Sequence, residues 1–109
     1  MNKEFFSEVN VVSDENMHEI KLTYYLLSGS VSREYCDLEV YGVEIDKETV
    51  PCGKSGKEKK QIKNLFFKRS EAVNFLEKIS RNKVTPMELK YVIKEYIDDQ
   101  IDAIVASNG

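Results

Sequence analysis

The alternation of apolar and polar residues predicts four β-strands in the first two thirds of the chain. The clearest example is segment 17–27, in which Ile20, Leu22, Tyr24 and Leu26 share one face of a strand. The four predicted strands span residues 4–12, 17–27, 33–45 and 60–66. Because short turns join such consecutive strands, the pattern favours an antiparallel meander.

The ends and faces of the first two strands follow from the same pattern. The first strand places Phe5, Val9 and Val11 on one parity, and so on one face, with Glu8 and Asn10 on the other. The second strand is followed by Ser28-Gly29-Ser30, whose composition is typical of a turn. We therefore predict that the chain reverses direction at these three residues.

The strand predicted over 33–45 changes phase near its middle. Its apolar residues occupy even positions from Cys36 to Val40 but odd positions from Val43 onward. Since side chains alternate strictly along a strand, one extra residue would keep both groups on the buried face. We predict a β-bulge at Tyr41-Gly42, because glycine is favoured at such sites, and we place Cys36 in the core. The alternative is that this end of the strand is covered on both faces.

Helical spacing of apolar residues predicts two helices, over 70–81 and 86–104. The second helix has a strong start signal, because Thr85 suits the N-cap and Glu88 can reach back to its amide. In this capping box the Thr85 hydroxyl would accept a hydrogen bond from a first-turn N–H. Val84 and Leu89 have the spacing of a hydrophobic staple. Two C-terminal helices must cover the apolar face of the meander, so we predict one α+β domain over residues 1–109.

Charge is distributed unevenly along the chain, although the net charge is only −3. Residues 1–50 carry eleven acids and four bases, whereas segment 54–69 carries seven bases and one acid. The candidate patch for an anionic partner consists of Lys54, Lys57, Lys59, Lys60 and Lys63. Segment 46–58 also holds a proline, two glycines and a serine, and is predicted to be an exposed, mobile loop. The basic patch is therefore either a binding surface or a solvated loop.

No catalytic or metal-binding motif is recognisable, and we predict no cofactor. Gly53-Lys54-Ser55 resembles the end of a phosphate-binding loop, but Glu48 stands where that motif requires a glycine. His18 is the single histidine, and the chain has no Gly-x-Ser-x-Gly elbow to pair with it. Cys52 lies in the predicted loop, as either a reactive thiol or an incidental surface cysteine. No apolar run approaches the length of a membrane span and no signal-peptide pattern is present, so we expect a cytoplasmic protein.

Three stretches of the chain resemble a known family. These are Thr23-Tyr24-Tyr25-Leu26, Glu34-Tyr35 with Tyr41-Gly42-Val43-Glu44-Ile45, and Asn82-Lys83-Val84-Thr85-Pro86-Met87-Glu88-Leu89 with Val92 and Tyr96. Together they resemble a family of small proteins from clostridia and related Gram-positive bacteria, known only as a domain of unknown function. The resemblance covers roughly residues 20–98 and implies a bacterial, cytosolic, single-domain protein. It implies no activity, cofactor or catalytic residue.

These observations favour a non-enzymatic regulatory or adaptor protein that acts through protein–protein contact. The apolar residues near the end of the second helix form the candidate interface: Tyr96, Ile97, Ile101, Ile104 and Val105. A homodimer through this surface is one form of the hypothesis, because twofold homodimers are the commonest oligomers. The first alternative is a nucleic-acid-binding module that uses segment 54–69. The second alternative is a small enzyme whose site the sequence does not reveal.

Overall fold

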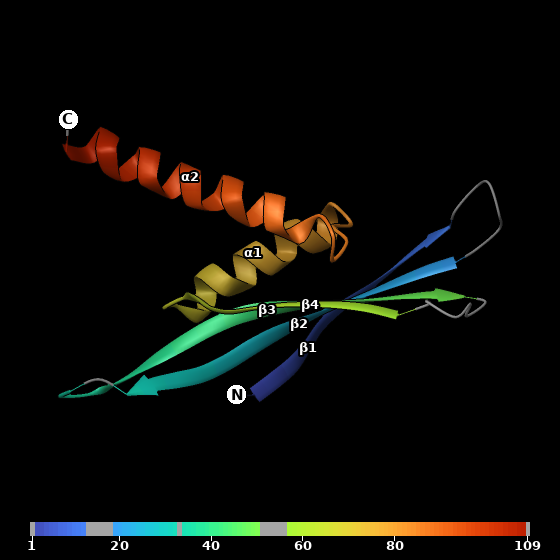
Figure 1. Ribbon diagram of the computed structural model, residues 1–109, viewed down its shortest axis with the longest axis horizontal. Helices are drawn as coiled ribbons and strands as arrows, with labels where there is room; N and C mark the ends of the chain where they lie inside the picture. Colours follow the sequence, from blue (N-terminus) through green and yellow to red (C-terminus); the bar gives the residue numbers. More distant parts are fainter. Residues whose placement is uncertain (1, 13–18, 33, 51–56, 109) are drawn as a thin grey trace.

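The computed structural model describes residues 2–12, 19–32, 34–50 and 57–108. Its strands are β1 (Asn2–Val12), β2 (Glu19–Ser32), β3 (Asp37–Val50) and β4 (Lys57–Phe66), and its helices are α1 (Arg69–Arg81) and α2 (Leu89–Asn108). The strands form one antiparallel sheet in the order β1-β2-β3-β4, so each pairs with its neighbour in sequence. Both helices lie on the same side of the sheet (Figure 1). The predicted α+β fold, a four-stranded meander followed by two helices, is confirmed.

The central strands are longer than the sequence pattern indicates. Strands β2 and β3 are each 14 residues long and pair along their whole length. The predicted turn at Ser28-Gly29-Ser30 is wrong, because these residues pair with Tyr41, Val40 and Glu39 of β3. The predicted loop 46–58 is likewise too long, since β3 continues to Val50 and β4 begins at Lys57. In a continuous β-ladder the backbone N–H and C=O groups of each strand find hydrogen-bond partners on the neighbouring strand. This gain outweighs the weak preference of glycine and serine for strands.

Pairing assigns the strand residues to two faces, because successive side chains point to opposite sides. On the face that the helices cover, Tyr24 pairs with Ile45 and Leu26 pairs with Val43, and all four are buried. The helices add a second set of buried residues to this core, namely Ala72, Phe75, Leu76, Ile79, Leu89 and Ile93. The helix-covered face therefore carries the main core.

A register shift does occur at Tyr41-Gly42, but the extra residues belong to β4. Tyr41 pairs with Phe66 and Val43 pairs with Ile62, so a single residue of β3 faces three residues of β4. Asn64 lies within this bulge and has a φ of 58°, in the left-handed region that asparagine tolerates. A Cβ atom on Gly42 would lie 2.1 Å from the carbonyl oxygen of Ile62. The bulged backbone of β4 therefore leaves no room for a side chain at this glycine.

The apolar residues of β3 change parity because the strand is covered on both faces there, which was our alternative explanation. No register shift separates β2 from β3, so Val40 and Val43 face opposite sides of the sheet, and both are buried. Leu27 is buried beside Val40 on the face away from the helices. The prediction of a core position for Cys36 is wrong, because this residue precedes β3 and is exposed. Cys36 lies in the connection between β2 and β3, and this end of the hairpin extends past α1 (Figure 1).

A bulge in β1 was not predicted. Phe5 pairs with Tyr25 and Ser7 pairs with Tyr24, so Phe6 is the extra residue. The bulge turns Phe5 to the face away from the helices, where its side chain is 58% exposed, whereas Val9 and Val11 pack against the core. The prediction of one common face for these three residues is therefore wrong, because residue parity does not reveal an inserted residue.

The joint between α1 and α2 is fixed to the sheet. Val84 and Leu89, the predicted staple pair, are both buried members of the core. The hydroxyl group of Tyr24, in the buried part of β2, donates a 2.8 Å hydrogen bond to the carbonyl oxygen of Val84. The joint is therefore held by a polar contact as well as by apolar packing.

The start of α2 differs from the predicted capping box. The Glu88 carboxylate accepts a hydrogen bond from the Thr85 amide at 3.2 Å, as predicted. The Thr85 hydroxyl does not accept an N–H bond but donates to the same carboxylate at 2.8 Å. The Thr85 carbonyl accepts hydrogen bonds from the N–H groups of both Glu88 and Leu89, which tightens this turn. The α-helix consequently begins at Leu89 instead of residue 86, and it ends at Asn108 instead of residue 104.

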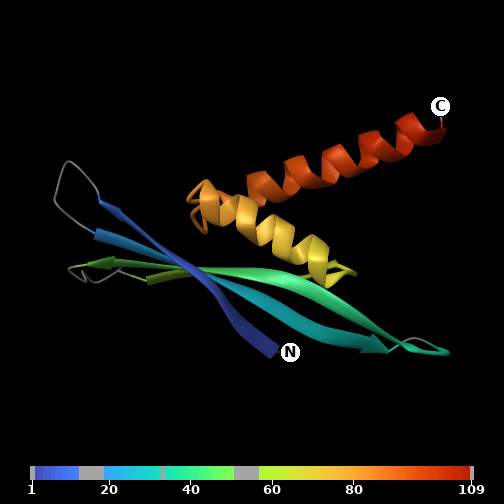
Figure 2. The same cartoon turned by 180° about the vertical axis from the view of Figure 1, so that it is seen from behind.

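The molecule is elongated. Its radius of gyration is 16.3 Å, whereas a compact domain of this length has a value of about 13 Å. Figures 1 and 2 show the reason: α2 rises away from α1 toward its C-terminus, and the β-hairpins extend beyond the helical layer. Much of the sheet and of α2 therefore remains uncovered.

Candidate functional site

The face of the sheet away from the helices carries a buried carboxylate, and we call this face the open face. Of the described elements, both helices lie on the other side (Figure 2). Glu44 of β3 pairs with Tyr25 of β2 on the open face, and its side chain is 0% exposed. A carboxylate removed from water is costly unless it is paired and hydrogen-bonded. The partners of Glu44 therefore define the candidate site.

Side chains from three strands converge on Glu44. The Lys3 ammonium of β1 lies 2.7 Å from Oε2, and the Gln61 amide of β4 donates to Oε1. Asp46 lies two positions further along β3, on the same face of the sheet as Glu44. The Lys3 ammonium also lies 4.3 Å from the centroid of the Tyr25 ring, a cation–π contact. We call these five residues the carboxyl network, and it links both edge strands to β3.

The network separates the acidities of its two carboxyl groups. Burial by itself would raise the pKa of Glu44, but the hydrogen bonds from Lys3 and Gln61 and the positive charge of Lys3 hold this pKa below its usual value. Burial raises the pKa of Asp46 to about 6, and the adjacent Glu44 carboxylate contributes to the increase. Asp46 also has a buried Oδ1 atom with no hydrogen-bond partner in the described part of the chain. The pair therefore combines an ionised group with a group that titrates near neutrality.

A shallow cavity of about 400 Å³ lies beside the network on the open face. Thr23, Tyr25 and Asp46 line it from β2 and β3, and Lys57 and Lys59 line it from β4. The register places Lys59 opposite Asp46 and Lys57 opposite Glu48. The cavity is therefore lined by charges of both signs.

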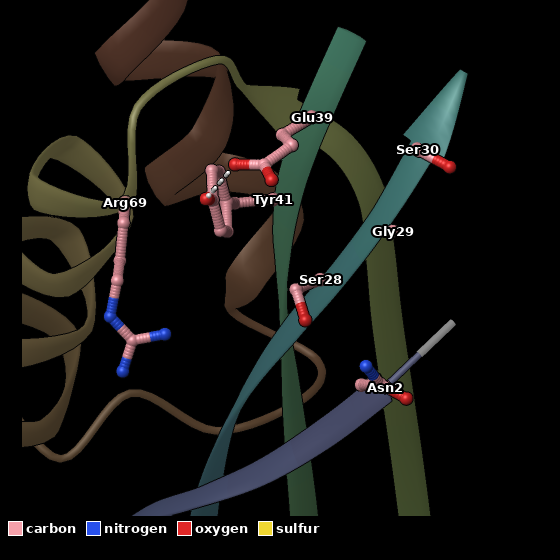
Figure 3. Close-up of a pocket in the computed structure, with 7 residues that line it drawn as sticks. All are labelled: Asn2, Ser28, Gly29, Ser30, Glu39, Tyr41 and Arg69. Carbon is pink, nitrogen blue, oxygen red and sulfur yellow. Dashed lines mark hydrogen bonds between the residues drawn. The ribbon is translucent and has the colours of Figure 1, made fainter. Parts of the chain in front are cut away.

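A larger cavity, of about 540 Å³, lies on the helix-covered side near the start of α1 (Figure 3). Ser28, Glu39 and Tyr41 come from the β2–β3 hairpin, and Arg69 faces them from α1 (Figure 3). The Tyr41 hydroxyl donates a 3.1 Å hydrogen bond to Glu39, while Arg69 pairs with Glu4 at 2.9 Å. Tyr41 and Glu39 of this cavity thus bond to each other, and Arg69 is engaged by a carboxylate outside the lining residues.

The structure divides the predicted protein interface into two parts. Tyr96 is half-buried, and its ring contacts Phe66 and Phe75 with centroid distances of 5.4 and 5.5 Å. Ile97, the next residue, is 43% exposed. The backbone of α2 continues as helix through the remaining predicted positions, whose side chains lie outside the described residues: Ile101, Ile104 and Val105. The candidate surface therefore begins at Ile97, where the described contacts with the core end.

The predicted basic patch does not form a row on one face. Lys57 and Lys59 lie on the open face opposite acidic residues, whereas Lys60 pairs with Ile45 and points to the other side. Lys63 is exposed at the bulge of β4. Lys54 lies outside the described residues, as do His18, Cys52 and the Gly53-Lys54-Ser55 segment. The described lysines thus lie within the edge strand β4, where lysine side chains commonly prevent pairing with another chain.

Sequence reasoning missed the carboxyl network. Glu44 and Asp46 appear in the sequence as polar residues of an alternating segment, which ordinarily indicates a solvated face. The missing information was the cross-strand register, because only pairing brings Lys3 and Gln61 to the same carboxylate. Within the described residues, no group of three His, Cys, Asp or Glu side chains is arranged to hold a metal ion. No described helix is both long and apolar enough to cross a membrane.

Comparison with protein families gives one match. The model described as "Family of unknown function (DUF6514)" matches residues 3–99, which include the carboxyl network and the first half of α2. The chain belongs to DUF6514. No curated protein and no solved structure shows a significant match to this DUF6514 chain. The family assignment agrees with the resemblance to a domain of unknown function, and it assigns no activity to any residue.

Proposed function

We propose that this protein is a non-enzymatic regulatory or adaptor module that binds another protein through the distal half of α2. The observation that carries the proposal is the change in environment at Ile97. Leu89 and Ile93 are buried and Tyr96 packs between two phenylalanines, but Ile97 is 43% exposed and the helix continues to Asn108. Isolated helical segments of this length are marginal in water, so a packing surface for the distal half would stabilise it.

The sequence of the distal half indicates the chemistry of its partner. Isoleucine and valine recur at helical spacing from Ile97 to Val105, as in helices that dock into an apolar groove. Residues 95–109 contain four acids and neither lysine nor arginine. A groove with an apolar floor and a basic rim matches both features. Two copies of α2 would bring like charges together, so a different protein fits better than a second copy.

Asp substitutions at exposed apolar positions test this proposal. Ile97→Asp places a charge on the proposed surface, while Met87→Asp adds the same charge at a position that is 71% exposed and precedes α2. We expect both variants to keep the thermal stability of the wild type, because neither side chain is buried. Removal of a central interface residue costs about 2 kcal/mol, which corresponds to roughly thirtyfold weaker binding.

The measurement is quantitative capture of partners from the native cytoplasm by the three proteins, followed by sedimentation of each protein alone. A partner retained by wild type and Met87→Asp but lost by Ile97→Asp supports the proposal. A dimer that only Ile97→Asp disrupts assigns the surface to a second copy. Identical partners and oligomeric states for all three proteins contradict a role for α2.

Cytosolic location in a bacterium is part of the proposal. Cys36 is an exposed free thiol, which suits a reducing compartment better than an oxidising one. The bacterial origin is inferred from the resemblance described above. The nucleic-acid alternative has less support, because Lys57 and Lys59 face acids and Lys60 lies on the opposite face.

A further inference from the structure

The two edges of the sheet differ in how they are protected against pairing with another chain. Along β4 lie Lys57, Lys59, Lys60 and Lys63, and a bulge leaves three residues of this strand facing one residue of β3. Lysine side chains and bulges are devices that commonly keep an edge strand from pairing. The opposite edge strand, β1, carries neither device beyond Phe6.

The part of β1 that follows Phe6 is a regular strand. Residues 7–12 pair with β2 without interruption and extend over about 20 Å. Their one charged residue is Glu8, and the valines among them favour an extended backbone. Because β1 is the outermost strand, every second residue directs its backbone N–H and C=O groups away from β2 (Figure 2). No other described strand pairs with this side, so it is a template for an added strand.

We propose that residues 7–12 pair with the same segment of a second copy of this chain, antiparallel and about a twofold axis at Val9. The two four-stranded sheets would then form one continuous eight-stranded sheet. The helices of both copies would lie on the same side of it, because the twofold axis is perpendicular to the sheet. This interface lies on β1 and does not use the proposed partner surface on α2.

The side chains favour a second copy, because the segment is complementary to itself in this register. Glu8 of each copy lies opposite Asn10 of the other on the open face, where the amide can donate a hydrogen bond to the carboxylate. Ser7 lies opposite Val11 on the helix-covered face, so a small side chain meets a branched one. An axis at Glu8 would instead place two carboxylates opposite each other, which is destabilising.

The size of the interface determines how strong the dimer is. Val9 and Val11 are half-buried in the single chain, and the added strand would cover more of each. A ladder of six residues from each copy is nevertheless small beside the interfaces of permanent dimers. We therefore expect a reversible dimer whose population rises with protein concentration.

Opposite charges at Asn10 test the register, because this position is exposed in the single chain. Asn10→Lys places a cation opposite Glu8 of the second copy, twice in each dimer, and should strengthen association roughly tenfold. Asn10→Glu places an anion there and should weaken association roughly tenfold. Within one copy Asn10 pairs with Lys21 of β2, so lysine at this position meets a like charge and glutamate an opposite one. Altered folding of the single copy would therefore give the reverse order.

Sedimentation equilibrium of the full chain over a series of concentrations gives the dissociation constant of each protein. Asn74→Lys and Asn74→Glu make the same changes at an exposed position of α1 near Tyr96, and they should leave the wild-type constant unchanged. Ile97→Asp should also leave it unchanged, which separates this dimer from any contact through α2. A wild type that is monomeric at every concentration overturns the proposal. Equal constants for the two Asn10 variants also overturn it.

Amide hydrogen exchange locates the contact. The amides of residues 7–11 that point away from β2 should exchange several-fold more slowly when the protein concentration is raised into the dimeric range, whereas β4 should not change. A dimer in which exchange of β1 does not depend on concentration is formed elsewhere, which contradicts the proposal. Protection of β1 that appears only after native cytoplasm is added to a monomer would assign this edge to a different protein and overturn pairing with a second copy.

Discussion

Substitution of Gly42 by alanine should destabilise the fold more than any exposed substitution. The new Cβ would lie 2.1 Å from the Ile62 carbonyl oxygen and 2.9 Å from the Lys63 Cα, both of which are backbone atoms. Real Cβ contacts are not shorter than 3.0 Å, so β4 would have to move by about 1 Å at its bulge. Overpacking of this kind costs about 1–3 kcal/mol, and we expect the upper end because no flexible side chain can yield. For a chain of this length, 3 kcal/mol corresponds to a fall in melting temperature of roughly 10–20 °C.

Urea denaturation and thermal melting of Gly42→Ala measure this cost, with Gly29→Ala as the matched control. Gly29 lies in the paired part of β2 and does not have a positive φ, so alanine should be tolerated there within about 1 kcal/mol. Amide NMR should also show that the disturbance in Gly42→Ala is centred on the pairing of Val43 with Ile62. If the free energy of unfolding of Gly42→Ala lies within about 0.5 kcal/mol of the wild-type value, the fold does not require the close approach of β4 to Gly42.

Three further predictions follow from buried or capping groups. Thr85→Ala removes the hydroxyl that donates to the Glu88 carboxylate and should lower the free energy of unfolding by about 1 kcal/mol in denaturant titrations, the usual value of a hydrogen bond, and an unchanged midpoint would show that this bond contributes no stability. Tyr24→Phe leaves the Val84 carbonyl without its 2.8 Å donor and should cost about 1–3 kcal/mol by the same measurement. The stability contribution of Asp46 should increase as pH is lowered from 7.5 to about 4, because the folded state, with a pKa of about 6, binds the proton more tightly than the unfolded state. The pKa of Glu44 is lowered in the folded state, so the stability contribution of Glu44 has the opposite pH dependence and should be lost below about pH 4.5. Melting curves of wild type and Asp46→Asn across pH 3–8 separate the two contributions. Parallel curves for the two proteins would refute the assignment to Asp46.

The sequence was sufficient for the architecture because local signals and the global fold agree. Alternation in segment 17–27 and the Thr85–Glu88 start signal each indicate one type of element, and both elements are present. The strand ends were less predictable. Gly29 looks like part of a turn by composition, yet it pairs with Val40 because an uninterrupted ladder satisfies the backbone. Composition describes single residues, whereas strand length is decided by the partner strand.

The candidate site depends on register, which the sequence does not specify uniquely. Lys3 and Glu44 are 41 residues apart, and they meet because Phe6 is inserted as a bulge in β1. Without that extra residue, the start of β1 would present its opposite face to the open side of the sheet. The bulge of β4 acts differently, because it inserts two residues between Ile62 and Phe66; the alternation of faces is kept, but the pairing shifts so that Phe66 lies opposite Tyr41. Inserted residues of this kind leave no reliable trace in residue parity.

The attachment of α2 has a mechanical consequence. A helix of 20 residues is about 30 Å long, and its described core contacts lie at one end, at Leu89, Ile93 and Tyr96. It is therefore a lever with a fixed base. The pivot is the joint at Val84, which Tyr24 ties directly to β2, an interior strand of the sheet. A lateral force on the tip of α2 would thus be transmitted as torque to β2 through Val84, and to the edge strand β4 through the contact of Tyr96 with Phe66.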